Sequence, residues 1–228
     1  RAGWITDFAQ LWPTGWPTTA VTKQLVQQAW PLGLSIFLSI AYTRLAILLL
    51  EAWGEAEAVA HYSAAWRLVE PTQILPASLL AAVFPAFSLA LTQNRRRAGQ
   101  LGRQTSLLLA LAGGTVSLTF WLAAPWLVGW LYGSDFAASG PVLQLLGLTV
   151  LPVYINYSLT HYLVARGQQQ MLTGLTAVTL LLHAFFCWLL IPRLGLLGPA
   201  LSVLLAESVL LLGCLWALRQ PTLLETAV

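Results

Sequence analysis

Six long apolar stretches, separated by short polar segments, dominate this chain. They run over about 27–50, 58–91, 106–131, 141–164, 171–191 and 196–218. About 20 apolar helical residues cross a bilayer, so each stretch is long enough to span one. Only 8% of the 228 residues are charged and 58% are hydrophobic, whereas an ordinary soluble domain carries about 25% charged residues. The sequence therefore predicts an all-α integral membrane bundle of six helices.

The basic residues between these stretches collect in alternate connections. One set of connections holds Lys23, Arg95, Arg96, Arg97, Arg103, Arg166 and Arg219, and the opposite set holds Arg193. Because Lys and Arg are retained on the cytoplasmic side during insertion, this asymmetry predicts a cytoplasmic N-terminal segment and a cytoplasmic C-terminal tail. The connections at 51–58, 131–140 and 191–198 are then expected on the outer face. The net charge of +3 follows from this asymmetry, so we expect no nucleic-acid partner.

The two ends of the chain differ in character from the spans. The chain begins at Arg1 with no initiator Met and no signal sequence, so we expect a segment of a longer protein. Trp4, Phe8, Leu11 and Trp12 follow helical spacing ahead of two prolines, which predicts an amphipathic element in the headgroup region, with a disordered linker as the alternative. The expected organisation is an interfacial linker over 1–22, a six-helix lobe over 23–219 and a tail over 220–228.

The second stretch is longer than a crossing requires and contains three prolines. Pro71, Pro76 and Pro85 each remove a backbone N–H from the helix. We therefore expect a kinked helix that tilts or projects from the bilayer.

Charged side chains inside the spans are few, and they are the main site candidates. Arg44 lies about 9 Å below the outer end of the first span at the helical rise, and Arg67 and Glu70 lie in the second span. Reflecting the hairpin about its outer turn places Arg44 and Arg67 at similar depth, which predicts a cationic spot facing a water-filled cavity. Two alternatives stay open. Arg67 and Glu70 could neutralise one another at i, i+3, and Arg44 could reach the outer headgroups.

Polar residues in the last three spans complete the candidate set. Glu207 is an unpaired carboxyl that could bond a polar group on a neighbouring helix or couple to a proton. The polar face that ends at His161 predicts residues lining the bundle interior, and Tyr42, Asn156 and His161 are the cavity-lining candidates. His183, in an apolar run, is expected to be a hydrogen-bonded core residue. Cys187 and Cys214 have neither metal-type nor disulfide-type spacing.

Motifs for catalysis are missing from the sequence. It contains no Gly-rich phosphate loop, no nucleophile elbow and no paired catalytic carboxylates. We therefore expect a transporter rather than an enzyme, with no catalytic residue, metal or cofactor.

Four passages carry a resemblance to a known family. The passages at 31–71 and 74–91 resemble the start of the second half of polysaccharide flippases in the multidrug/oligosaccharidyl-lipid/polysaccharide exporter superfamily. The first has an Arg in its first helix, an acidic outer turn and a second helix with a Tyr near its start, and the second has a proline-bearing helix before a basic loop. The passages at 127–173 and 189–207 are similar to that family's later helices. An acidic residue often follows the first Arg by two positions in this family, and here that position is Ala46.

The resemblance implies one lobe of a two-lobe flippase of about twelve helices. Its substrates would be saccharides on a polyprenyl pyrophosphate carrier, turned across the bacterial inner membrane by alternating access for cell-surface polysaccharide synthesis, including O-antigen. Arg44 and Arg67 would hold the pyrophosphate, and Glu70 and Glu207 would be ion-pair or coupling candidates. The implied partners are membrane lipid, the lipid-linked saccharide, an N-terminal six-helix lobe, and the polysaccharide polymerase and glycosyltransferases of the pathway.

Other functions compete with this interpretation. A cation-coupled drug or small-molecule exporter and a lipid II flippase share the architecture, although lipid II flippases commonly carry two further helices beyond the twelfth. A polymerase or glycosyltransferase of the same pathway would be expected to show clustered carboxylates or a large outer loop. The sequence has neither.

Overall fold

The structure, a computed structural model, describes residues 19–53 and 56–220. These residues form helices without any strand, which confirms the predicted all-α class. The elements are α2 (Thr19–Ala52), α3 (Ala56–Val69), η1 (Glu70–Gln73), α4 (Ile74–Gln93), α5 (Arg95–Tyr132), η2 (Ser134–Phe136), α6 (Ser139–Ala165), α7 (Gln169–Leu194) and α8 (Leu197–Ala217). Most of the predicted linker over 1–22 and most of the tail over 220–228 lie outside the described residues.

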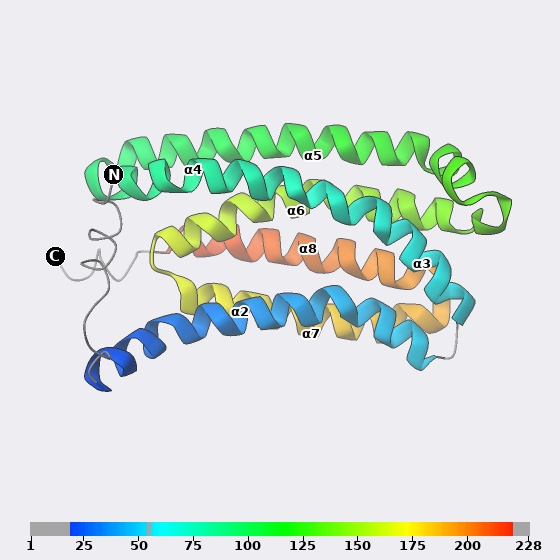
Figure 1. The fold of residues 1–228 in the computed structure, drawn as a ribbon, viewed down its shortest axis with the longest axis horizontal. Coiled ribbons are helices and arrows are strands. Elements are labelled where there is room, and N and C mark those ends of the chain that lie inside the picture. The colour runs from blue at the N-terminus through cyan, green and yellow to red at the C-terminus, as the bar shows by residue number, and fades with distance from the viewer. Residues whose placement is uncertain (1–18, 54–55, 221–228) are drawn as a thin grey trace, which may run out of the picture.

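Six spans run side by side along the length of the bundle (Figure 1). Within the described residues, six helical stretches are long and apolar enough to cross a membrane, and α3, η1 and α4 together form the second of them. The six-helix membrane bundle expected from the sequence is therefore confirmed. Consecutive spans are antiparallel because the turns between them are short.

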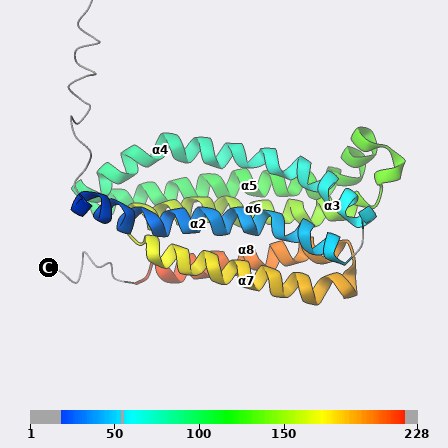
Figure 2. The same ribbon diagram turned by 60° about the horizontal axis from the view of Figure 1, so that its bottom comes forward.

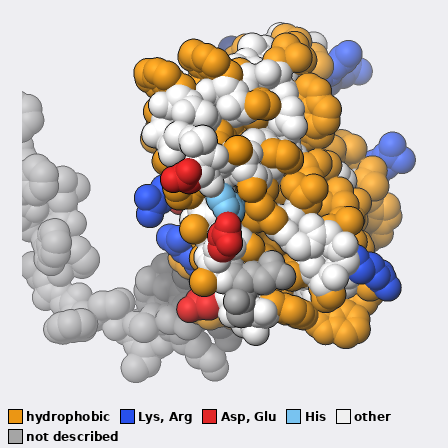
Figure 3. Space-filling model, turned by 90° about the vertical axis from the view of Figure 1, so that its right-hand side faces the viewer, with side chains coloured by type: hydrophobic (Ala, Val, Ile, Leu, Met, Phe, Trp, Pro, Cys, Tyr) orange, Lys and Arg blue, Asp and Glu red, His pale blue; other side chains and the backbone are white. Residues whose placement is uncertain are grey.

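The two ends of the bundle collect different turns. The α4–α5 and α6–α7 turns lie at the end where α2 begins, and the α2–α3, α5–α6 and α7–α8 turns lie at the other end (Figure 1). The end where α2 begins therefore holds most of the basic residues of the turns: Arg96, Arg97, Arg103 and Arg166. Arg193 lies at the opposite end of the bundle. Figure 3 looks onto this second end, where acidic side chains gather and hydrophobic side chains cover the flank.

Helix α5 is longer than the sequence pattern indicates. The segment 92–104 was expected to be a cytoplasmic connection, but α5 begins at Arg95. Asn94 caps the helix, because its Oδ1 accepts a hydrogen bond from the Arg97 N–H at 3.2 Å. Arg, Gln, Leu and Ala are good helix formers, so the basic segment continues the helix outward. At 38 residues, α5 is about 57 Å long and exceeds a hydrocarbon core of about 30 Å.

The second span bends at a short 3-10 segment rather than at each of its prolines. Pro71 lies at the start of η1, which separates α3 from α4. Pro85 lies inside α4 without interrupting it. The expected kink is therefore present at Pro71, where the missing N–H cannot continue the α-helical ladder. Figure 2 shows the change of direction between α3 and α4.

Helix α6 forms the centre of the bundle. It packs on α3, α5 and α8, and Val142, Leu143, Leu146 and Leu163 are fully buried along it. The Ser117 hydroxyl of α5 donates to the Gly147 carbonyl at 2.7 Å and accepts from the Leu151 N–H at 3.1 Å. These bonds between α5 and α6 are typical of membrane helices, where small and hydroxyl residues allow close backbone approach. Helix α6 is therefore the most buried of the six described spans, and α3, α4, α5 and α8 pack against it.

Candidate functional site

A cavity of about 890 Å³ lies inside the bundle. Helices α2, α4, α6, α7 and α8 contribute to its wall, together with the end of α3 and with η1. Its polar lining residues are Ser35, Ser39, Tyr42, Thr43, Thr72, Gln73, Thr149, Tyr154, Asn156, Tyr157, Thr160, His161, Thr176, Thr179 and Glu207. The remaining wall is apolar, so these polar groups stand on a largely apolar surface and offer a hydrophilic ligand hydrogen bonds that lipid cannot supply.

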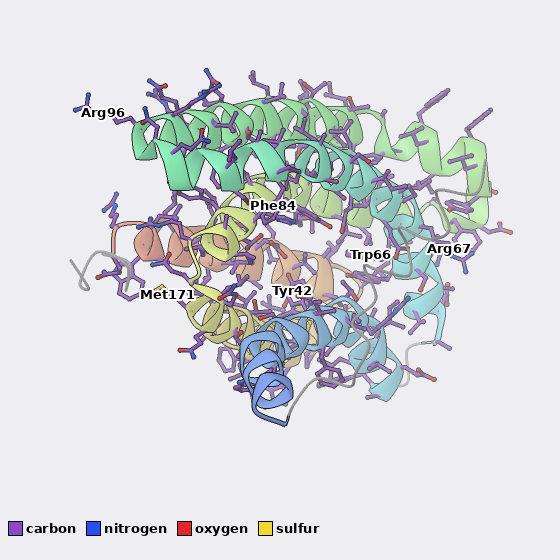
Figure 4. The ribbon with its side chains drawn as sticks, turned by 60° about the vertical axis from the view of Figure 1, so that its left-hand side comes forward. Tyr42, Trp66, Arg67, Phe84, Arg96 and Met171 are labelled. Carbon is purple, nitrogen blue, oxygen red and sulfur yellow. The ribbon has the colours of Figure 1, made fainter. Side chains whose placement is uncertain are left out.

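The cavity opens sideways between α2 and α4. Ile36 and Ile40 on α2 and Ala77 and Ala81 on α4 line it and are exposed, whereas its lining residues on α6 are buried or half-buried. Figure 1 shows α2 and α4 well apart, with α6 and α8 visible between them. In Figure 4, Tyr42 and Phe84 lie on either side of this space. Helices α2 and α4 are therefore the rims of the cavity, and α6 and α8 form its floor.

Glu207 lies on that floor with a partner on the neighbouring helix. It is 8% exposed, and the Asn156 side-chain N–H₂ donates to its carboxylate Oε2 at 2.8 Å and to its backbone carbonyl at 3.0 Å. The sequence left two roles open for Glu207, pairing with a polar group or coupling to a proton. The structure shows the pairing, with Asn156 as the partner. Asn156 Oδ1 is buried beside the cavity without a hydrogen-bond partner, whereas the Tyr42 hydroxyl interacts with the Glu207 carboxylate.

Two tyrosines of α6 attach the floor to the bend of the second span. The Tyr154 hydroxyl donates to the Thr72 carbonyl in η1, and the Tyr157 hydroxyl bonds Gln73 Oε1 at 3.4 Å. His161 lies one turn further along, where its Nδ1 contacts the Tyr157 carbonyl at 2.7 Å. The ring of His161 also meets Phe84 of α4 edge-on, with ring centroids 6.2 Å apart. The structure thus places Tyr42, Asn156 and His161 on the cavity wall.

The arginine candidates lie elsewhere. Arg44 and Arg67 are exposed on α2 and α3, and neither is among the residues that line the cavity. In Figure 4 the Arg67 side chain extends away from the space beside Trp66. Glu70 is also exposed and off the cavity wall, and no ion pair within 4 Å joins it to Arg67 in the described structure. The described structure therefore does not contain the neutralising ion pair between Arg67 and Glu70 that the sequence left open.

A buried polar cluster of His183, Cys187 and Ser202 lies next to the Tyr42 ring. His183 is fully buried, and its Nδ1 lies 2.7 Å from the Ser202 hydroxyl on α8. Cys187 Sγ lies 3.4 Å from the same hydroxyl. The rings of His183 and Tyr42 are 4.6 Å apart between centroids, at a tilt of 47°. His183 is thus the hydrogen-bonded core residue that the sequence indicated, and it holds the Tyr42 ring in place.

Several wall residues were not singled out from the sequence. Ser35 and Ser39 on α2, and Thr176 and Thr179 on α7, line the cavity. Each pair follows helical spacing of three or four residues within an apolar run, and that stripe was the available signal. Among the described residues, no group of three or more His, Cys, Asp or Glu could hold a metal ion.

Comparison with known proteins adds to this geometry. A MatE family model matches residues 31–189, which is more than half of the chain. This chain belongs to the MatE family. The chain is therefore a multi-pass membrane protein of a transporter family, as expected from the sequence.

One relative of this MatE chain is a curated protein. It is a Shigella dysenteriae protein named "Putative O-antigen transporter", and 195 aligned residues are 25% identical. The alignment covers 85% of this chain and 48% of the relative. The chain therefore spans about half the length of the curated relative that it matches.

Proposed function

We propose that this chain is one lobe of a transporter that turns polyprenyl-pyrophosphate-linked saccharides across the membrane by alternating access. The observation that carries the proposal is the cavity, with hydroxyl, amide and carboxyl groups on its wall, that opens sideways from a membrane-spanning bundle of a MatE protein. Its similarity to a protein named as an O-antigen transporter supports a saccharide carrier as the substrate. A hydrophilic head group needs such a cavity, while its polyprenyl tail stays in lipid.

The lateral mouth is the proposed contact with a second lobe. Ile36 and Ile40 on α2 are 56% and 59% exposed, and they line the cavity at its mouth between α2 and α4. A second six-helix lobe across this mouth would complete the central pathway, as expected for repeat-built transporters. The bend at η1 makes the second span a suitable moving part, because a helix that is already interrupted bends at low cost.

Arg44 and Arg67 are the proposed pyrophosphate ligands on the pathway between the lobes. Guanidinium groups stay charged and bond phosphate oxygens in pairs. Both side chains are exposed on the described lobe, which suits a ligand held outside its own cavity. The basic turns are the proposed cytoplasmic side, in the inner membrane of a bacterium.

Glu207 favours a second candidate function. A buried carboxylate on the wall of a membrane cavity is a suitable group for coupling transport to a cation, as in an exporter of small cationic molecules. Such an exporter would share the whole architecture. The two functions differ in the substrate that accumulates when the gene is lost.

The test measures the transbilayer location of lipid-linked saccharides after deletion of the complete gene. We expect accumulation on the cytoplasmic face, reversed by the wild-type gene. Arg44→Ala or Arg67→Ala should lower flipping about tenfold or more, because each lost charged contact to phosphate is worth about 1.5–3 kcal/mol. Arg193→Ala is the control, since Arg193 lies in the last turn of α7, away from the α2 and α3 positions that carry the proposed ligands.

Two results would contradict parts of the proposal. An unchanged saccharide distribution in the deletion strain would leave the small-molecule exporter as the function. Normal flipping by both arginine variants, at normal protein level, would remove the pyrophosphate assignment and keep the flippase.

A further inference from the structure

We infer that the cavity of this lobe receives the uncharged saccharide of the substrate and excludes its pyrophosphate. The inference rests on the proposed function and assigns a separate compartment to each part of the head group. Three features of the described wall carry it: its charge, its hydrogen-bonding groups and its aromatic rings.

The charge of the wall is wrong for a phosphate anion. Glu207 is the only Asp, Glu, Lys or Arg among the cavity-lining residues of the described helices, and Arg44 and Arg67 are not on the wall. Like charges repel strongly where water is scarce. A pyrophosphate beside Glu207 would meet no Lys or Arg on the described cavity wall that could neutralise it.

The wall carries hydrogen-bonding groups that can pair with the hydroxyls of a sugar. Asn156 Oδ1 is buried beside the cavity without a partner, and an amide oxygen can only accept. A sugar hydroxyl donates one hydrogen bond and accepts others, so it can satisfy this oxygen and also reach the Tyr42 hydroxyl, which interacts with the Glu207 carboxylate. Thr176 and Gln73 add further hydroxyl and amide groups on opposite walls. Leaving buried polar atoms unpaired is costly, so a ligand that supplies donors is favoured at this place.

Aromatic rings border the same space. Trp66 and Phe84 lie on the second span, and Tyr154 and Tyr157 face them from α6. Aromatic faces carry partial negative charge and pack against the C–H faces of sugar rings, which carry partial positive charge. The combination of flat apolar faces and convergent hydroxyl and amide groups is typical of sites for neutral saccharides.

Glu207 then sets the specificity of the compartment. Its carboxylate can accept from sugar hydroxyls, as it does from Asn156. It repels a carboxylate carried by the ligand, so sugars bearing uronic acids should be excluded. The compartment should take neutral sugars and reject acidic ones.

The experiment uses the complete purified transporter with a cysteine on the cavity wall. Ser39→Cys places the thiol on an exposed wall position of α2, and Ser78→Cys is the matched control on α4, exposed and outside the cavity. The native Cys187 and Cys214 have no exposed area and should not react. The rate of maleimide labelling is measured in the presence of each of three competing compounds. They are the saccharide released by mild acid from the lipid carriers of the source strain, inorganic pyrophosphate, and tetragalacturonate.

We expect the released saccharide to slow labelling at Ser39→Cys at least about threefold, with no effect of pyrophosphate or tetragalacturonate and none on Ser78→Cys. Adding Glu207→Gln should allow tetragalacturonate to protect, whereas Glu51→Gln, at the exposed end of α2, should not. Protection by pyrophosphate, no protection by the saccharide, or equal protection of the wild-type wall by tetragalacturonate would each overturn the inference.

The same strains separate this inference from the proposed function. If the deletion strain does not accumulate lipid-linked saccharide on the cytoplasmic face, the flippase itself is contradicted. If flipping depends on the gene but the saccharide does not protect Ser39→Cys, only the compartment assignment fails.

Discussion

At the scale of single residues, the described wall depends on the pair formed by Asn156 and Glu207. Both side chains are nearly inaccessible, at 4% and 8% exposed. The amide satisfies the carboxylate at 2.8 Å and leaves its own oxygen free for a ligand. A buried carboxyl without such a donor is costly, so Asn156 has a structural role as well as a place on the cavity wall.

We predict that Asn156→Ala lowers the thermal stability of the detergent-solubilised protein by about 1–2 kcal/mol, because a buried acceptor loses its donor within the bundle. The measurement is a double-mutant cycle with Glu207→Ala, in which thermal unfolding gives the stability of each variant. A coupling energy of about 0.5–2 kcal/mol is expected. Strictly additive effects of the two substitutions would show that the hydrogen bond contributes nothing to stability.

At the scale of elements, the turn between α7 and α8 shows how closely two spans pack. Gly195 ends α7 with φ of 53°, a conformation that favours glycine. Gly198 follows at the start of α8, where an added Cβ would lie 2.8 Å from backbone atoms of Leu190 and Ile191. Backbone atoms cannot move aside as a flexible side chain can. The α7–α8 hairpin therefore requires a residue without a side chain at this position.

We predict that Gly198→Ala destabilises the protein by about 1–3 kcal/mol, the usual cost of overpacking. Gly174→Ala is the matched control, because a Cβ there meets nothing within 4 Å on the same hairpin. Thermal unfolding of both variants in detergent measures the difference. Equal melting temperatures for Gly198→Ala and wild type would show that the turn relaxes without cost.

At the scale of the whole molecule, the basic residues and the turns give the bundle two unlike ends. The end with the α4–α5 turn carries the arginines of the first α5 turns, and the opposite end carries Glu51, Glu57 and Asp135. Helix α5 is longer than a hydrocarbon core is thick, so we expect Arg96 and Arg97 to reach the headgroups. Insertion should retain this basic end in the cytoplasm.

We predict that an impermeant maleimide labels Ser134→Cys in intact spheroplasts and labels Gln100→Cys only after the membrane is permeabilised. Both positions are exposed: Gln100 lies near the start of α5, and Ser134 lies in η2, just beyond the end of α5. The buried native cysteines supply the unlabelled background. The reverse pattern would invert the orientation of the lobe and place the basic end outside.

The number of spans, the helical class and the bend of the second span could be predicted because they depend on local properties. Apolar length decides whether a segment can cross a bilayer, and Pro71 removes a hydrogen bond wherever it lies. Helix boundaries were less certain, since the cap at Asn94 extends α5 through residues that appeared to be a loop. The polar wall positions Tyr42, Asn156 and His161 could be named from the sequence, because polar residues in apolar spans face the interior.

The sequence by itself determined a six-span membrane bundle, its charge asymmetry and the residue types available inside it. Only the tertiary structure decided which of them share a cavity. It paired Asn156 with Glu207 across α6 and α8, and it left Arg44 and Arg67 off the cavity wall. Depth along a span follows from counting residues, but the direction of a side chain depends on the rotation and packing of each helix against its neighbours.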